Sequence, residues 1–402
     1  MPISALMLND SPVKLWGLSS NQRLRGQIRE MGGIEWLEDI ADLPPGGSVL
    51  LLDGNYLFEI RTLRNLLERP DSILHCASDD RPAAAFVGAE HAALAASHMG
   101  AGSEGGSSDV PTPLNRLEIS DLDAFDPKLR FVRPPLLEHI TRETRSSLET
   151  LLYGNSYRGI TDLVTKFVWP KPARQVVSLC AKLGLSPNMV TTIGFILVVA
   201  ASYLFLHGYY LSGLLAGWVM TFLDTVDGKL ARVTIQSSRF GDIYDHAIDV
   251  IHPPFWYIYW GLSLAPFQPV LGINLYEMGW VIAIAYLSGR AIEGVFPFLG
   301  GPSVFTWRPF DAWFRLVVAR RNPCMIILTL GALIGRPDWG YIGVAGWLSM
   351  STVILLVRSL QGLFARITRG PLTSWLSEDG VANGPHAKSF KVFSGTWGAY
   401  AG

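Results

Sequence analysis

Cysteine and charge are both scarce in this chain of 402 residues. It contains three cysteines, and charged residues make up 17% of the sequence. The cysteines, Cys76, Cys180 and Cys324, lack the spacing of a metal site, so we expect them to be packing residues and predict neither a disulfide framework nor a zinc centre. The formal net charge is −1 and no basic run with interleaved aromatics occurs. Nucleic acid is therefore not an expected partner.

The amino-terminal segment also lacks the pattern of a cleaved signal. It reads Met-Pro-Ile-Ser-Ala-Leu, with no basic region followed by an apolar core. We therefore expect the first 130 or so residues to stay in the cytoplasm.

Apolar residues, in contrast to cysteine and charged residues, are abundant. They make up 49% of the sequence, and the mean hydropathy is +0.26, which is high for a soluble protein and predicts insertion into a membrane. Six apolar stretches approach the length of about 20 residues that a helix needs to cross a bilayer. The predicted transmembrane helices are 189–206, 210–231, 241–264, 278–298, 323–335 with its flanks, and 341–364.

The charges of the connections predict the orientation of these helices. Segments 207–212 and 265–277 contain no Lys or Arg, whereas segments 229–239 and 290–321 contain several. The positive-inside rule then places both termini in the cytoplasm, and only Arg336 departs from the pattern. We expect a multi-pass protein of a bacterial-type inner membrane.

The first 98 residues have the pattern of a soluble α/β domain. Strands are predicted at 13–18, 48–53 and 72–76, and helices at 21–31 and 61–69. This alternation indicates a mostly parallel sheet, with Asp53 at the carboxyl end of a buried strand, where such sheets bind ligands or metals.

The run Leu50-Leu-Leu-Asp53-Gly54-Asn55 resembles the sugar-nucleotide and cytidylyl transferases, in which such an acid holds metal. Those enzymes have a Gly-rich phosphate loop with Arg or Lys, whereas 15–23 here has one glycine. A degenerate, non-catalytic nucleotidyltransferase-like domain is therefore expected.

The sequence predicts four parts. They are a cytoplasmic α/β domain (1–135), juxtamembrane amphipathic helices (136–187), a six-helix membrane domain (188–367) and a cytoplasmic tail (368–402). Within them, 100–113 has the composition of a flexible linker. Segment 159–184 is predicted to lie on the membrane surface, with a packed linker helix as the alternative.

Four carboxylates lie at the ends of two of the apolar stretches. Asp224 and Asp227 are three residues apart, and Asp245 and Asp249 are four apart, so each pair shares one helical face and the pairs can converge across a turn. Four converging carboxylates need a divalent cation or shared protons, and all-oxygen ligands favour Mg²⁺, Mn²⁺ or Ca²⁺ over zinc. The alternative is a polar loop with helix-capping aspartates.

The spacing D-x2-D-G-x2-A-R-x8-G-x3-D-x3-D, together with Pro187-Asn188 and Thr191 at the start of the first predicted span, resembles the CDP-alcohol phosphotransferases. The resemblance covers residues 160–367 and implies an integral membrane enzyme of phospholipid or polar head group synthesis. Such an enzyme transfers a phosphate-linked alcohol from a CDP-alcohol to an acceptor hydroxyl and releases CMP. The family often forms homodimers.

The resemblance also implies a role for each motif position. Two Mg²⁺ or Mn²⁺ ions would be held by Asp224, Asp227 and Asp245 with Asp249 nearby, and Asp249 would be the general base. The CDP moiety would lie against the backbone at small residues and beside one arginine, and these positions are Gly228, Ala231, Arg232 and Gly241.

Further residues are weaker candidates. Lys229 is expected to contact phosphate or lipid head groups, and His246 and His252 to be hydrogen-bonded bystanders. A phosphorylated acceptor would need arginines, which bind phosphate through two donors. The cytoplasmic side offers Arg290, Arg308, Arg320, Arg321 and Arg358, of which we select Arg290, Arg308 and Arg358.

The motif leaves the substrates open. The donor is either CDP-diacylglycerol or a soluble CDP-alcohol, and a bifunctional cytidylyltransferase and phosphotransferase using a phosphorylated polyol such as inositol phosphate is an alternative. Two other classes remain, a cation transporter and a catalytically inactive membrane scaffold. A transporter would place its acids in the middle of the spans, whereas these lie at span ends beside Lys229 and Arg232.

Overall fold

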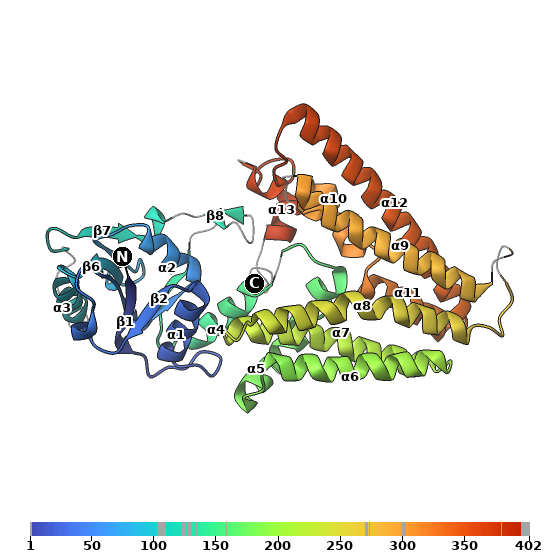
Figure 1. The fold of residues 1–402 in the computed structure, drawn as a ribbon, viewed down its shortest axis with the longest axis horizontal. Coiled ribbons are helices and arrows are strands. Elements are labelled where there is room, and N and C mark those ends of the chain that lie inside the picture. Colours follow the sequence, from blue (N-terminus) through green and yellow to red (C-terminus); the bar gives the residue numbers. More distant parts are fainter. Residues whose placement is uncertain are drawn as a thin grey trace. The chain divides into compact units, whose positions relative to one another are not determined.

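A computed structural model describes residues 2–102, 110–122, 125–126, 131–132, 135–157, 159–269, 272, 274–299, 303–378 and 380–394. These residues form two compact units (Figure 1). The first comprises Met1–Gly154 with Val233–Gln236, and the second comprises Asn155–Arg232 with Ser237–Gly402. Half of the predicted linker, 103–109, and the end of the predicted tail, 395–402, lie outside the described residues.

The first unit contains a six-stranded sheet with the order β2-β1-β3-β6-β5-β7. Neighbours β2, β1 and β3 are parallel, β6 runs antiparallel to both β3 and β5, and β7 is parallel to β5. The strands are β1 Ile3–Asp10, β2 Ile34–Leu37, β3 Ser48–Gly54, β5 Ser72–His75, β6 Pro82–Gly88 and β7 Asn115–Glu118. Additional short strands are β4 Tyr56–Phe58, β8 Phe125–Asp126, β9 Phe131–Val132 and β10 Leu137–His139.

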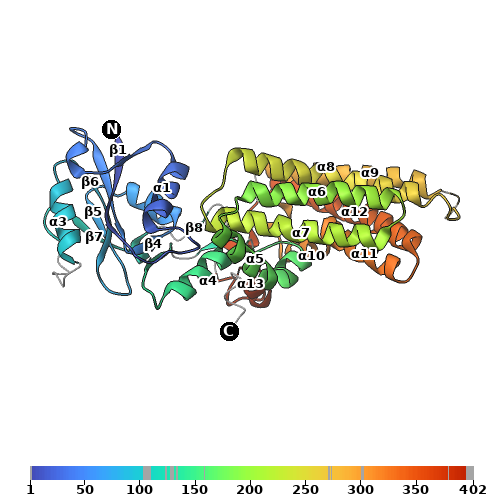
Figure 2. The same cartoon turned by 90° about the horizontal axis from the view of Figure 1, so that it is seen from below.

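Helices cover both faces of this sheet, because β3 and its neighbours are apolar on both sides (Figure 2). On one face Leu50 and Leu52 pack with α1 Ser20–Met31 and α2 Ile60–Leu67. On the other face Leu51 packs with α3 Ala92–Gly102. The α/β domain predicted from the sequence is therefore present.

The strand predicted at 13–18 is wrong. The first strand is β1, which ends at Asp10, and the residues after it form a loop with one isolated bridge between Leu15 and Leu18. Pro12, two residues after the end of β1, carries no backbone N–H to donate to a sheet. The apolar residues that suggested a strand, Val13 and Leu15, are buried because they pack with Leu148 of α4 Arg145–Asn155.

Trp16 lies at the centre of that loop, where nucleotide-binding α/β domains place a phosphate loop. Its indole N–H donates to the Glu149 carbonyl at 3.0 Å, its backbone N–H donates to the Glu149 carboxylate at 3.1 Å, and its ring lies 5.9 Å from that of Tyr153. Trp16 is buried and Gly17 adopts a φ of 79°. The loop is thus filled by its own side chains.

The second unit is helical. It begins with a π-helical turn at Val164–Val168, and its helices are α5 Pro170–Leu183, α6 Pro187–Leu206, α7 Tyr210–Val233, α8 Arg239–Ser263, α9 Leu275–Val295, α10 Pro309–Val317, α11 Arg321–Leu333, α12 Pro337–Arg369 and α13 Ala387–Ser394. Each of the six predicted apolar stretches forms a helix in this set, α6 to α9, α11 and α12.

The helices of the second unit share one apolar core. Helix α6 packs on α8, α8 on α9, α9 on α12 and α12 on α11, and Figures 1 and 2 show α6, α7 and α8 running side by side. Trp260 and Tyr341 are completely buried, and Trp260 donates to the Pro337 carbonyl at 3.3 Å while Tyr341 donates to the Tyr257 carbonyl at 2.9 Å. Large aromatic side chains thus join α8 to α12 while their polar atoms stay bonded.

Three helices of the described part of the chain are long and apolar enough to cross a membrane. They are Pro187–Leu206, Leu275–Phe298 and Pro337–Arg369, and a fourth span results if α10 and α11, bent by 43°, count as one. Their outer faces expose large apolar side chains such as Ile196, Ile284 and Leu360. Helices α7 and α8 have 24 and 25 residues, and both carry the charges of the aspartate motif.

Candidate metal centre and its surroundings

The four predicted carboxylates lie where α7 ends and α8 begins. Asp224 and Asp227 are in the last turns of α7, and Asp245 and Asp249 are in the first three turns of α8. Ser238 caps α8 by accepting a hydrogen bond from the Gly241 N–H at 3.0 Å, so the second helix starts immediately after a short connection. This helix–turn–helix brings the two pairs together, as their spacing predicted.

Three of these carboxylates can share one ion. One oxygen from each of Asp224, Asp227 and Asp245 lies within 4.8 Å of the others. Asp227 is buried, and the other two are partly buried. An all-oxygen set of three carboxylates in a partly buried position suits Mg²⁺ or Mn²⁺, because these ions prefer oxygen ligands and offset the mutual repulsion.

Thr191 of α6 orients the most buried member of this group. Its hydroxyl donates to Asp227 Oδ2 at 2.6 Å, while Asp227 Oδ1 accepts from the backbone N–H of Gly228 at 2.5 Å. Both oxygens of Asp227 therefore have a fixed direction, which is how neighbouring hydrogen bonds hold a metal ligand in place. The sequence marked Thr191 as part of a motif but did not assign it this contact.

Asp249 is held by an arginine from α11. Arg321 donates through Nη1 to Asp249 Oδ1 and through Nη2 to Asp224 Oδ2, both at 2.5 Å. The Asp249 side chain is 36% exposed, against 19% for Asp224. Asp249 thus lies beside the three-carboxylate group and is more accessible than Asp224. Arg321 was one of five arginines indicated by the sequence, with nothing to distinguish it.

The small residues of the motif allow close packing. A Cβ atom on Gly241 would lie 2.8 Å from Asn188 Oδ1 and 3.0 Å from Ser238 Oγ, and one on Gly228 would lie 3.1 Å from a guanidinium nitrogen of Arg232. Arg232 is exposed and lies close enough to Asp245 to act on it electrostatically. Of the residues predicted to bind the CDP moiety, Gly228 therefore contacts Asp227 through its N–H and Arg232 lies near Asp245, while Ala231 and Gly241 are on the same two helices as the carboxylates.

Lys229 is buried and contacts protein groups, although it was expected to contact phosphate or lipid head groups. Its ammonium donates to the Ser156 carbonyl at 2.9 Å and lies 3.6 Å from the centre of the Tyr157 ring. Lys229 therefore attaches α7 to the segment that precedes the π-helical turn. His252 is also buried, and its Nδ1 is 2.5 Å from the Ile248 carbonyl, as expected for a residue bonded within its own helix.

A second contact holds the juxtamembrane segment to α11. Asn322 donates to Asp162 Oδ1 at 2.9 Å, and the same oxygen accepts the backbone N–H groups of Val164 and Thr165 at the start of the π-helical turn. Burial raises the pKa of Asp162, but the charge of Arg315 and these hydrogen bonds outweigh it, so the net pKa is below the usual value. Asp162 is therefore an ionised anchor.

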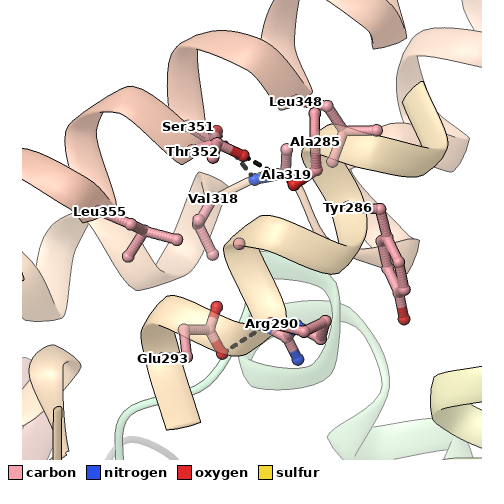
Figure 3. Close-up of a pocket in the computed structure, with 11 residues that line it drawn as sticks. Ala285, Tyr286, Arg290, Glu293, Val318, Ala319, Leu348, Ser351, Thr352 and Leu355 are labelled. Carbon is pink, nitrogen blue, oxygen red and sulfur yellow. Dashed lines mark hydrogen bonds and ion pairs between the residues drawn. The ribbon is translucent and has the colours of Figure 1, made fainter. Parts of the chain in front are cut away.

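A pocket lies between α9, the 318–319 connection and α12 (Figure 3). Tyr286 lines it and donates to the backbone carbonyl of Asp249 at 3.4 Å, which joins the pocket to the carboxylates. Arg290 also lines it and forms an ion pair with Glu293, which pairs with Arg320 as well. The pocket thus has polar walls of both charges.

The other predicted arginines lie elsewhere. Arg358 makes two hydrogen bonds to Asp311, at 2.6 and 2.8 Å, and lies over the Trp307 ring at 4.6 Å. Arg308 lies over the same ring at 5.3 Å. The structure therefore brings Arg308 and Arg358 together at Trp307, whereas of the three selected arginines Arg290 is the one that lines the pocket.

Part of the second unit is similar in sequence to known proteins. Residues 184–368 match the family model described as CDP-alcohol phosphatidyltransferase, the family that the motif resembles. An archaetidylinositol phosphate synthase of Pyrococcus horikoshii is 40% identical over 82 residues, which are 20% of this chain and 42% of that protein.

Two further relatives have different substrates in their names. A phosphatidylinositol phosphate synthase of Mycobacteroides abscessus is 31% identical over 91 residues, 22% of this chain and 41% of that protein. Choline/ethanolaminephosphotransferase 1 of Arabidopsis thaliana is 33% identical over 116 residues, 21% of this chain and 28% of that protein. The chain thus spans less than half the length of these three relatives.

Proposed function

Because residues 184–368 belong to the CDP-alcohol phosphatidyltransferase family, we propose that the chain transfers a phosphate-linked alcohol from a CDP-alcohol to an acceptor hydroxyl and releases CMP. The observation that carries this proposal is the group formed by Asp224, Asp227 and Asp245 with Asp249 beside it. The product would be a phospholipid or a polar head group.

The three grouped carboxylates, with Asp249 nearby, are the residues that would hold Mg²⁺ or Mn²⁺, and two ions are proposed. Bound divalent cations would neutralise a pyrophosphate and stabilise the attacking and leaving oxygens. Thr191 fixes the direction of Asp227 toward this group. The family resemblance assigns Gly228, Ala231 and Gly241 to contact with the cytidine diphosphate, and Arg232 supplies a positive charge near Asp245.

Asp249 is the proposed general base. It accepts the proton of the acceptor hydroxyl while that oxygen forms a bond to the phosphorus of the transferred group, and the bond from the same phosphorus to the CMP oxygen breaks. CMP leaves with that electron pair. The partial exposure of the Asp249 side chain supports an acceptor hydroxyl that can reach this carboxylate.

Arg290, which lines the pocket beside Tyr286, is the one of the three selected arginines that we propose contacts a polar acceptor. The archaetidylinositol phosphate synthase and the phosphatidylinositol phosphate synthase among the relatives favour a phosphorylated polyol such as inositol phosphate as the acceptor. The choline/ethanolaminephosphotransferase favours the other arrangement, in which a soluble CDP-alcohol is the donor and a lipid is the acceptor. Arg308 and Arg358, which were predicted with Arg290, have contacts that favour a role in the fold.

The first unit is proposed to be non-catalytic. Its sheet order and its antiparallel β6 are consistent with the nucleotidyltransferase resemblance, and Asp53 accepts hydrogen bonds from Asn9 at 3.0 Å and from the Asn55 backbone at 2.8 Å. The loop after β1, however, is filled by Trp16. This packing disfavours the bifunctional alternative, in which the first unit would bind CTP.

We further propose that α6 to α9, the α10–α11 pair and α12 make six membrane spans, with both termini and the carboxylates on the cytoplasmic side of a bacterial-type inner membrane. The charge distribution of the connections supports this orientation. A homodimer is proposed from the family resemblance.

Release of CMP by the purified protein in lipid nanodiscs tests the function. CDP-diacylglycerol with inositol phosphate, and CDP-choline or CDP-ethanolamine with diacylglycerol, are the two substrate pairs to compare, each with and without Mg²⁺. Asp249→Asn should abolish CMP release, whereas Asp242→Asn, which removes an exposed carboxylate of the same helix, should retain it. Absence of CMP with every pair would favour the transporter or scaffold alternatives.

A further inference from the structure

Arg321 occupies an unusual position for a cation. It is the first residue of α11, where the helix dipole disfavours positive charge, so its place is not explained by stabilisation of the helix. Its guanidinium instead reaches two carboxylates from two other helices, Asp224 of α7 and Asp249 of α8. The side chain is 15% exposed, so these contacts are shielded from water.

The backbone on both sides of Arg321 is fixed. The Ala319 N–H donates to Ser351 Oγ at 3.1 Å, and the side chain of Asn322 donates to Asp162 at 2.9 Å. Asp162 and Asn322 are both buried. A guanidinium on such a rigid support presents two donors in a defined direction, which a flexible ammonium does not.

The two contacts of Arg321 have different consequences. The bond to Asp249 Oδ1 fixes the direction of the proposed base, so the second oxygen of that carboxylate has a defined place from which to accept a proton. The bond to Asp224 Oδ2 adds a positive charge to the group that would hold the metal. This charge reduces the repulsion among the carboxylates, but it also opposes the binding of a further cation.

We propose that Arg321 is a positioning residue that bridges the metal-holding group to the base, fixing Asp249 at the cost of weaker cation binding. This inference rests on the proposed function for the role of Asp249. It predicts that loss of Arg321 has opposite effects on two measurements, because metal binding improves while the reaction slows. A residue that only supported the fold would weaken both.

Mn²⁺ binding and CMP release, measured on the full-length protein in nanodiscs, test the proposal. In Arg321→Gln, we expect the Mn²⁺ affinity, followed by the electron paramagnetic resonance of free Mn²⁺, to rise about tenfold because one nearby positive charge is lost. We expect kcat for CMP release to fall on the order of 100-fold because Asp249 is no longer oriented, with the donor KM within about twofold of the original.

Arg321→Lys separates charge from geometry. It keeps the positive charge but not the two-pronged contact, so the Mn²⁺ affinity should stay within about twofold while kcat falls on the order of tenfold. Arg369→Gln removes an exposed arginine at the end of α12 and should change neither quantity.

The outcomes distinguish this proposal from the proposed function. A fall in both Mn²⁺ affinity and kcat of Arg321→Gln, or an unchanged kcat, would overturn the role of Arg321. If Arg321→Gln does not give a monodisperse protein, Arg321→Lys decides, and a kcat equal to that of the unmodified protein overturns the proposal. If the unmodified protein releases no CMP, the proposed function is overturned instead. If the Mn²⁺ affinity does not rise in Arg321→Gln, the effect of the Arg321 charge on cation binding is overturned, whatever the result for CMP release.

Discussion

The hydroxyl of Thr191 donates to the carboxylate of Asp227 at 2.6 Å, and this contact joins the first apolar helix of the second unit to the metal-holding group. Asp227 is 3% exposed, so the hydrogen bond is made in an environment where water cannot replace it. The same hydroxyl is 3.1 Å from the Pro187 carbonyl, which fixes its rotamer. The orientation of Asp227 therefore depends on a residue 36 positions earlier in the chain.

Thr191→Val should weaken metal binding without removing a ligand. The variant keeps the shape of the side chain but leaves Asp227 without its hydroxyl donor, and loss of such a neighbouring hydrogen bond typically costs about 10- to 100-fold in metal affinity. The Mg²⁺ concentration for half-maximal CMP release should rise accordingly. Thr192→Val is the matched control, because Thr192 is exposed and its hydroxyl donates to the Asn188 carbonyl of its own helix at 2.8 Å. An unchanged Mg²⁺ dependence in Thr191→Val would contradict this role.

Lys229→Met should detach the segment before the π-helical turn. It removes the hydrogen bond to the Ser156 carbonyl and the contact with the Tyr157 ring, both of them buried, and we expect a loss of about 2 kcal/mol of stability. The thermal midpoint in detergent should fall, and limited proteolysis should cut sooner near residue 156. Lys182→Met, at an exposed site near the end of α5, should change neither result. Equal proteolysis of both variants would count against the contact.

Much of the aspartate site could be predicted because its geometry is local. Pairs of carboxylates spaced by three and four residues on consecutive helices must share a face, and a short connection brings the two faces together. The contacts of Arg321 were not predictable in the same way. Its partners are 97 and 72 residues away in the sequence, and no local pattern distinguishes it from Arg320 beside it.

The same distinction applies to the fold. The helices predicted from apolar length are present, because a long apolar run determines a helix without reference to the rest of the chain. The prediction of a strand at 13–18 was wrong because the apolar residues of this loop pack against α4, more than 130 residues later in the chain. They alternate with polar residues as in a strand, but they do not pair with a sheet. Lys229 likewise has a partner that only the three-dimensional packing supplies.

Asp311→Asn should destabilise the second unit. Asp311 is 1% exposed and both of its oxygens accept from Arg358, so removal of its charge leaves the partly buried arginine without its carboxylate partner. Breaking one side of such a pair costs about 3 kcal/mol. The thermal midpoint should fall in Asp311→Asn and in Arg358→Met, and the double variant Asp311→Leu with Arg358→Met should be more stable than either.

Kinetics of the same variants test whether Arg358 also contacts the acceptor. If its role is confined to the fold, Arg358→Met and Asp311→Asn should leave the acceptor KM within about twofold, whereas Arg290→Gln, in the pocket, should raise it by about tenfold or more. A rise in the acceptor KM that occurs in Arg358→Met but not in Asp311→Asn would indicate that Arg358 contacts the acceptor.

His75 should make the first unit sensitive to acid. It ends β5, and burial lowers its pKa below the ordinary value of 6.5, with the charge of Arg116 acting in the same direction. Below pH 6.5 the unfolded chain therefore protonates at His75 more readily than the folded unit does. The free energy of unfolding is thus at its full value above pH 6.5 and falls as the pH falls toward the lowered pKa. Hydrogen exchange of the β5 amides in the full-length protein, corrected for intrinsic rates, should rise between pH 7 and pH 5. His75→Asn keeps a donor for the Asp80 carbonyl, which lies 3.2 Å from Nδ1, and should remove most of that rise, whereas His91→Asn should retain it. An equal rise in His75→Asn and the unmodified protein would assign the acid sensitivity to other groups.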